Sequence, residues 1–153
     1  MAARRSERLA VVLRIAEREE QAAASRLRER RDHVEREQQQ LAQLEAYRGQ
    51  YFSDYREMTR GVDAATLQSY SGFLQRLGDA LAGQQQKLAQ AHQWLEQGRM
   101  EWQRRYHRRC SLEEMIKRLR REELSEQDRR QQRELDDLAG QRRHGRGGAA
   151  RKF

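Results

Sequence analysis

The residues of this chain that could do chemistry are few, and their spacing suits no reaction. Its single cysteine, Cys110, has no CxxC companion, and no glycine-rich phosphate loop occurs. Adjacent carboxylates such as Glu113 and Glu114 point in different directions on a helix. The histidines lack the His-x-x-x-His spacing of a metal site; they are His33, His92, His107 and His144. The sequence therefore predicts no catalytic residue, metal ion or cofactor, and a protein that is not an enzyme.

Arginines are concentrated towards the end of the chain, where they could contact a phosphate backbone. Residues 104–121 carry 8 basic and 2 acidic groups, and residues 122–139 carry 3 basic and 7 acidic groups. Clustered cations bind nucleic acid by releasing its counterions. Because the acidic block follows at once and no recognition motif is present, we expect no nucleic-acid partner.

Aromatic residues gather around one short segment, Gly61-Val62-Asp63. Six of the ten Phe, Tyr and Trp residues flank it: Tyr47, Tyr51, Phe52, Tyr55, Tyr70 and Phe73. Such rings at helical spacing either thicken a hydrophobic core or form a docking surface for another protein. Both alternatives stay open at this level.

Two heptad seams must position these residues, one on each side of the same segment. One seam begins at Leu9 and the other ends at Leu119, and each is apolar at 12 of its 16 core positions. The intervening glycine can end a helix in the left-handed conformation, and Asp63 can cap the next one. We therefore predict an all-α fold, a long antiparallel two-helix coiled-coil hairpin in residues 1–139, with helices at about 5–60 and 66–138 and a tip at 61–65.

The end of the chain has a different composition. Residues 140–153 contain four glycines and no apolar period, which predicts a disordered basic C-terminal tail.

Antiparallel pairing restricts the helix register to residue numbers that sum to 125 or to 132. We favour 125, because it places Glu20 opposite Arg105 and Gly98 opposite Leu27. The register of 132 remains the alternative.

The overall composition agrees with solvated helices rather than a globular core. The chain has no proline, 37% charged residues and a mean hydropathy of −1.22. A lone cysteine suits a reducing compartment, and the short apolar run that begins at Leu9 is interrupted by Arg14. We expect a cytoplasmic protein that neither spans a membrane nor is secreted, and a monomeric rod.

A set of residues stands at fixed spacing around the tip: Gly61-Val62, then Leu67, Tyr70, Phe73, Leu77 and Ala80 after the turn, and Gln40, Leu44, Tyr47 and Tyr51 before it. In these residues the sequence resembles the FliJ family of the bacterial flagellar type III export apparatus. The resemblance covers about residues 7–125. It implies a stalk, similar to the γ subunit coiled coil of rotary ATPases, that works at the flagellar base on the inner face of the cell membrane.

The resemblance also implies partners. Family members insert into the hexameric flagellar export ATPase and promote its assembly, contact the cytoplasmic part of the export gate, and bind export chaperones. The family's gate contacts would map to Gln40, Leu44, Tyr47, Tyr51, Phe73, Leu77, Ala80 and Gln84. We expect the ATPase to contact the charged open end of the hairpin at Arg4, Arg5, Arg8, Arg14, Arg18, Arg104, Arg105, Arg108 and Arg109.

Two other classes of protein fit the same pattern. The stalk of a virulence-type injectisome would share the fold and the kinds of partner. A general coiled-coil scaffold would share the fold alone.

Overall fold

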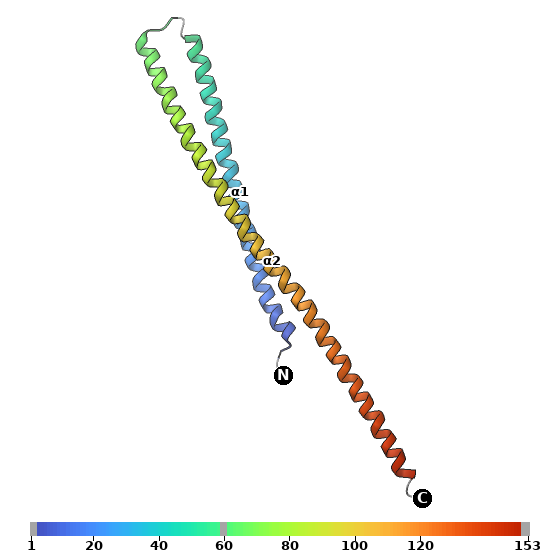
Figure 1. Cartoon of the computed structure of the whole chain (residues 1–153). Coiled ribbons are helices and arrows are strands. Elements are labelled where there is room, and N and C mark those ends of the chain that lie inside the picture. Colours follow the sequence, from blue (N-terminus) through green and yellow to red (C-terminus); the bar gives the residue numbers. More distant parts are fainter. Residues whose placement is uncertain (1–2, 59–60, 151–153) are drawn as a thin grey trace. The chain divides into compact units, whose positions relative to one another are not determined.

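The protein is built from two long helices. The computed structural model describes residues 3–58 and 61–150, with side chains as far as residue 146. Helix α1 spans Arg5–Met58 and helix α2 spans Ala64–Ala150 (Figure 1). Neither described range contains a strand. The expected all-α fold with an antiparallel helix pair is confirmed.

The helices contribute to two compact units. One unit, Arg18–Tyr106, contains the turn and the parts of α1 and α2 that flank it. The other contains Met1–Glu17 and His107–Phe153, in which the start of α1 packs against α2 and α2 continues past it. Each unit is thus a helix pair.

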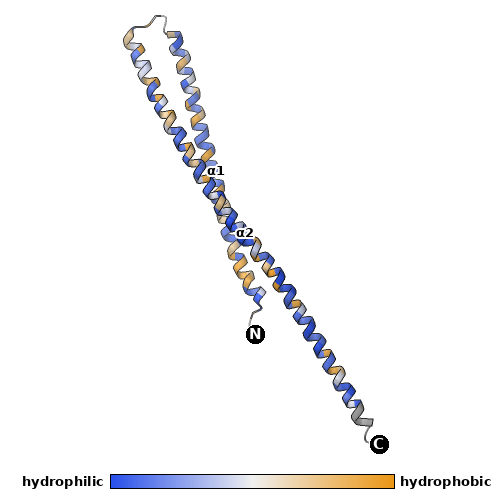
Figure 2. Cartoon of the chain, in the orientation of Figure 1, coloured by the Kyte–Doolittle hydropathy of each residue, from blue (hydrophilic) through white to orange (hydrophobic). Residues whose placement is uncertain are grey.

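The buried side chains confirm the predicted seams. The buried apolar residues of the described chain all occupy core positions of the heptad series through Leu9, Leu13, Leu67 or Tyr70. They are Ala16, Ala23, Leu27, Val34, Leu77, Leu81, Ala91 and Ile116. Along both helices, hydrophilic residues are in the majority, with hydrophobic residues recurring between them (Figure 2). Because burial of a large aliphatic side chain contributes about 1.5–3 kcal/mol, this narrow seam supplies the main attraction between the helices.

Asp63 begins α2 as expected. Its carboxylate accepts hydrogen bonds from the Thr66 hydroxyl and, at 3.1 Å, from the Thr66 amide. Its carbonyl accepts the amide of Leu67 at 3.2 Å, the first bond of the helical pattern. The Thr66 hydroxyl, followed by the Thr66 amide, lowers the pKa of Asp63. The helix therefore starts at Ala64, two residues before the predicted start.

The predicted role of Gly61 was wrong. No glycine in residues 3–58 or 61–150 has a positive φ angle, so Gly61 does not end α1 in the left-handed conformation. Its amide instead donates to the Met58 carbonyl at 3.4 Å. Helix α1 ends at Met58, and the predicted last residue, 60, lies outside the described residues.

The end of α2 also differs from the expected boundary. The helix continues through residue 139 to Ala150, and residues 151–153 lie outside the described part of the chain. With no proline in the sequence, no residue removes a backbone donor there. The side chains of residues 124–146 are exposed, apart from half-buried Gly140, so this segment lacks the packing that stabilises most helices.

This exposure predicts weak protection of the segment. Amides of residues 126–150 should exchange with solvent at least tenfold faster than those of residues 77–91, because only the latter lie in the packed seam. Native-state hydrogen exchange measured by NMR tests this. Equal protection in the two segments would show that α2 is stable without a packing partner.

Contacts across the seam in unit Arg18–Tyr106 support the register of 125. The rings of Tyr55 and Tyr70, whose numbers sum to 125, lie 6.0 Å apart between centroids. Two expected partners are shifted, however: Arg105 bonds Glu19 at 2.8 Å, and Arg30 rather than Leu27 occupies the space over Gly98. The register rule pairs residues directly opposite each other, but a long side chain can contact a residue one turn away.

The same register should hold in the other unit. A cysteine pair at Leu13 and Leu112, in a Cys110→Ser background, should form a disulfide within one chain, because continuous helices keep one register. Non-reducing mass spectrometry measures the crosslink. Efficient crosslinking of Leu13 with Leu119 instead would favour 132, and crosslinks only between chains would contradict the hairpin.

Candidate interaction surfaces

Tyr51 lies at the centre of an aromatic cluster beside the turn. Its ring stacks on Phe73 with centroids 4.4 Å apart, and lies 5.1 Å from the ring of Tyr70 and 5.3 Å from that of Tyr47. Burial, followed by the neighbouring Tyr47 and Tyr70 phenols, raises the pKa of Tyr51. Aromatic rings from α1 and α2 therefore pack against one another beside the turn.

The cluster is only partly covered. Tyr51, Tyr55, Tyr70 and Phe73 are half-buried, and Tyr47 is 48% exposed. From residue 35 to residue 76, no described side chain is fully buried. Tyr51 and its α2 partners thus thicken the seam, while Tyr47 forms the outer edge of the cluster. Phe52, 46% exposed, has no ring contact within the described parts of the chain.

Substitution by alanine should separate packing from exposure. Tyr51→Ala should lower the free energy of unfolding by about 1–3 kcal/mol, because it removes three ring contacts. Tyr47→Ala and Phe52→Ala should each change it by less than about 0.5–1 kcal/mol. Urea unfolding monitored by circular dichroism measures all three. Equal losses would mean that Tyr47 belongs to the core.

The residues assigned by resemblance to the export gate occupy different environments. Gln40, Tyr47 and Ala80 are exposed, whereas Leu44, Tyr51 and Phe73 are half-buried. Leu77 and Gln84 are buried, at 7% and 6% exposure. These two side chains lie in the seam and support the surface rather than form it.

Gln84 is a polar residue held inside the seam. Its amide group donates to the Glu37 carbonyl at 3.1 Å and to the Glu37 carboxylate. A buried amide is costly unless it is hydrogen-bonded, so this pair favours one alignment of the two helices.

The arginines expected to contact an ATPase divide between the two units. Arg18, Arg104 and Arg105 belong to the unit with the turn, and the remaining six belong to the other. Arg105 pairs with Glu19, and Arg109 pairs with Glu113, each at 2.8 Å. Arg4, Arg5, Arg8 and Arg14 are exposed.

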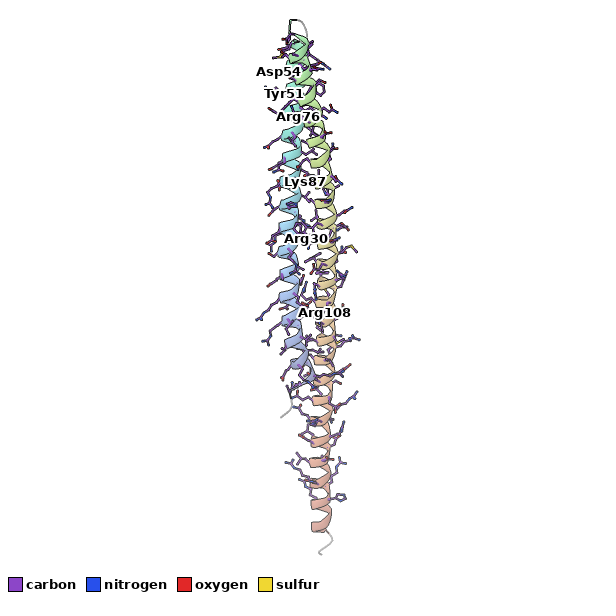
Figure 3. The ribbon with its side chains drawn as sticks, turned by 90° about the vertical axis from the view of Figure 1, so that its left-hand side faces the viewer. Arg30, Tyr51, Asp54, Arg76, Lys87 and Arg108 are labelled. Atoms are coloured by element: carbon purple, nitrogen blue, oxygen red, sulfur yellow. The ribbon has the colours of Figure 1, made fainter. Side chains whose placement is uncertain are left out.

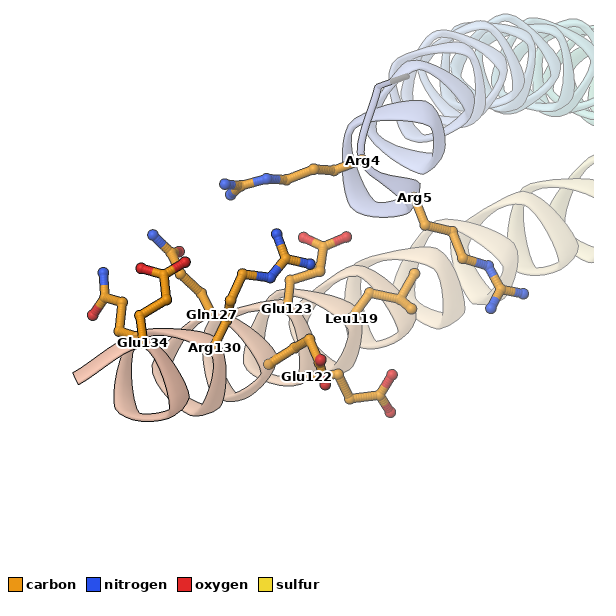
Figure 4. A pocket seen from close by; sticks show the side chains of 10 residues that line it. Arg4, Arg5, Leu119, Glu122, Glu123, Gln127, Arg130 and Glu134 are labelled. Carbon is orange, nitrogen blue, oxygen red and sulfur yellow. The ribbon is translucent and has the colours of Figure 1, made fainter. Parts of the chain in front are cut away.

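The first arginines of the chain lie beside acidic residues of α2, not only beside its basic residues 104–121. Arg4 and Arg5 line a groove of about 860 Å³ with Glu122 and Glu123 of α2 (Figure 4). This juxtaposition follows from the point at which α1 begins, opposite the start of the acidic stretch.

Glu123 caps the first turn of α1, a contact that sequence reasoning missed. Its carboxylate accepts the Ser6 amide at 3.0 Å and the Ser6 hydroxyl at 2.6 Å. The first amides of a helix have no partner within the helix and carry partial positive charge, so a carboxylate stabilises them. The Ser6 hydroxyl, then the Ser6 amide and the charges of Arg4 and Arg120, lower the pKa of Glu123.

The Glu123 cap should be lost in acid. A lowered folded-state pKa means that the stabilisation is present above the ordinary pKa of glutamate and disappears as pH falls through the lowered value. Protection factors of the first amides of α1 should therefore drop between about pH 5 and pH 2.5. Glu123→Gln should remove this dependence and Glu122→Gln should keep it. An unchanged profile in Glu123→Gln would contradict the assignment.

Arg30 and Trp94 form a second contact that sequence reasoning missed. The guanidinium carbon of Arg30 lies 4.6 Å from the centre of the Trp94 ring, and its Nη1 donates to the Trp94 carbonyl at 2.8 Å. A Cβ on Gly98 would lie 2.9 Å from Arg30 Cδ, so the glycine leaves room for this side chain. Figure 3 shows Arg30 among the side chains beside the helix pair. A glycine at a core position was the available signal.

Among the described residues, no three His, Cys, Asp or Glu side chains come together as a metal site. No described helix has an apolar stretch long enough to cross a membrane.

Comparison with known families bears on which of three classes the protein belongs to: a flagellar export stalk, an injectisome stalk or a general coiled-coil scaffold. The family model for the flagellar FliJ protein matches residues 5–148. The chain belongs to the FliJ family. No curated protein and no solved structure matches it. The FliJ match favours a flagellar protein over an injectisome stalk or a general scaffold, and it makes this a protein of the flagellar export apparatus.

Proposed function

We propose that this FliJ-family chain is a non-enzymatic stalk that joins the flagellar export ATPase to the membrane export gate. It would act in the cytoplasm, at the inner face of the membrane below the flagellum, and would also bind export chaperones. Membership of the family supports this role. The observation that carries it is the half-open aromatic cluster around Tyr51.

The cluster suits a gate contact because Tyr51 is fixed by its packing against Phe73 and Tyr70, whereas the ring of Tyr47 remains accessible to a partner. Phe73 stacks on Tyr51 at 4.4 Å, and Tyr47 lies 6.3 Å from Phe73 with half of its surface exposed. Rigid aromatic anchors contribute strongly to protein interfaces because they lose little conformational entropy on binding. Tyr47 and Phe73 are therefore the residues that we assign to the gate, with Leu77 and Gln84 beneath them.

Substitution of the two rings tests the gate assignment. Tyr47→Ala with Phe73→Ala should weaken binding to the purified cytoplasmic part of the export gate at least tenfold and reduce motility. Phe52→Ala is the control for Tyr47. Both rings are on α1 and are similarly exposed, at 46% and 48%, but Phe52 lies outside the cluster. Equal weakening by Phe52→Ala, or none by the double variant, would contradict the assignment.

The ATPase contact rests on exposed arginines in the unit that contains the start of α1. Arg8 and Arg14 are exposed. Exposed ion pairs contribute only about 0–1 kcal/mol each, so several together give a contact that forms and breaks readily.

Charge reversal tests the ATPase contact separately. Arg8→Glu with Arg14→Glu should reduce stimulation of the purified flagellar export ATPase several-fold at low salt, with helicity unchanged. Arg76→Glu, near the turn, should have no effect. If the Arg8 and Arg14 variant stimulates normally, the ATPase contacts the chain elsewhere.

A further inference from the structure

A basic groove with an apolar floor lies between α1 and α2 in unit Arg18–Tyr106. Its volume is about 410 Å³. Leu27, 7% exposed, and half-buried Trp102 line it from the two helices. Arg28, Arg31 and Arg99 surround these apolar residues. None of these residues belongs to the gate or ATPase assignments above.

The charge of this groove has a single sign. Three arginines and no carboxylate line it. Among the residues that the structure describes, no ion pair joins Arg28 or Arg31 to a carboxylate. Arg99 pairs with Glu96 at 3.0 Å, but both side chains are more than half exposed, so the pair is weak. All three guanidinium groups can therefore donate hydrogen bonds to an incoming carboxylate.

The floor of the groove is rigid enough to receive an anchor. Trp102 stacks on Tyr106, with ring centroids 5.3 Å apart and planes inclined by 28°. Leu27 belongs to the seam itself. Tryptophan and arginine are the residues that most often dominate binding energy when a partner desolvates them. The hollow beside Trp94, in contrast, is lined by Glu29 and Glu37 as well as by cations, and it selects no charge.

We propose that this groove binds an acidic protein segment. The segment inserts one aliphatic or aromatic side chain between Leu27 and Trp102, and its flanking carboxylates pair with Arg28, Arg31 and Arg99. Charge complementarity selects the acidic partner, and the aliphatic part of the floor favours a protein side chain over a nucleic-acid base. A nucleic acid would need a series of stacking rings along a cationic track.

A defined peptide tests the proposal on the full chain. The probe is a fluorescein-labelled 14-residue peptide with two leucines four residues apart and glutamates at most other positions. Fluorescence anisotropy should show saturable binding that weakens with salt. The same peptide with lysine in place of glutamate should not bind.

Variants locate the binding site. Arg28→Glu with Arg31→Glu should weaken binding at least tenfold, whereas Arg76→Glu with Lys87→Glu, an equal change in charge outside the groove, should weaken it less than threefold. Trp102→Ala should also weaken binding, and circular dichroism checks that each variant remains helical. Absence of saturable binding, or equal affinity in the two charge-reversed variants, overturns the proposal.

Two other occupants would also overturn it. Tighter binding of a labelled single-stranded DNA 12-mer that is lost in Arg28→Glu with Arg31→Glu would make the groove a nucleic-acid site. Sedimentation showing a dimer that the same variant dissociates would make a second copy of the chain the occupant. Neither outcome alters the gate and ATPase tests, which use other residues.

Discussion

The whole structure depends on how little two helices can bury between them. Eight apolar side chains are buried in the described part of the chain, all on predicted seam positions, and several are alanines. Among the other side chains that the structure describes, Ser6 and Gln84 are also buried, and the rest are at least partly exposed. Stability must therefore be supplemented by contacts such as the Gln84 amide on Glu37 and the Glu123 carboxylate on Ser6. These polar contacts also favour one alignment, which uniform hydrophobic packing does not.

The same shortage of buried volume explains why large side chains stay partly exposed on the surface instead of enclosing a cavity. Near the turn, large rings replace the small residues of the seam, and the pair cannot enclose them; Tyr51 is held while Tyr47 stays exposed. Farther along, Trp102 remains half-buried over Leu27, and arginines surround it. An aromatic surface and a basic groove thus arise within one unit, separated along the helices, and each can serve a different partner.

Heptad spacing was sufficient to predict the helix pair, its seam and the cap at Asp63, because these depend on periodicity and local hydrogen bonding. Details set by side-chain reach were not predictable. Arg105 bonds Glu19 rather than the expected Glu20, and Arg30 fills the space over Gly98, since long side chains span a turn of helix. The aromatic residues around the turn were identified from the sequence, but which of their rings are half-buried and which are exposed depends on side-chain packing that spacing does not reveal. The burial of Leu77 and Gln84, in contrast, agrees with their heptad core positions.

In the assembled apparatus, we propose, the outer edge of the aromatic cluster faces the export gate. Photo-crosslinking in flagellated cells tests this most directly, with a benzophenone amino acid placed at Tyr47 or at Phe52. We expect crosslinks to the cytoplasmic part of the gate from position 47 and few from position 52, because Tyr47 borders the cluster and Phe52 does not. Equal crosslinking from both positions, or gate crosslinks from position 52 alone, would contradict it.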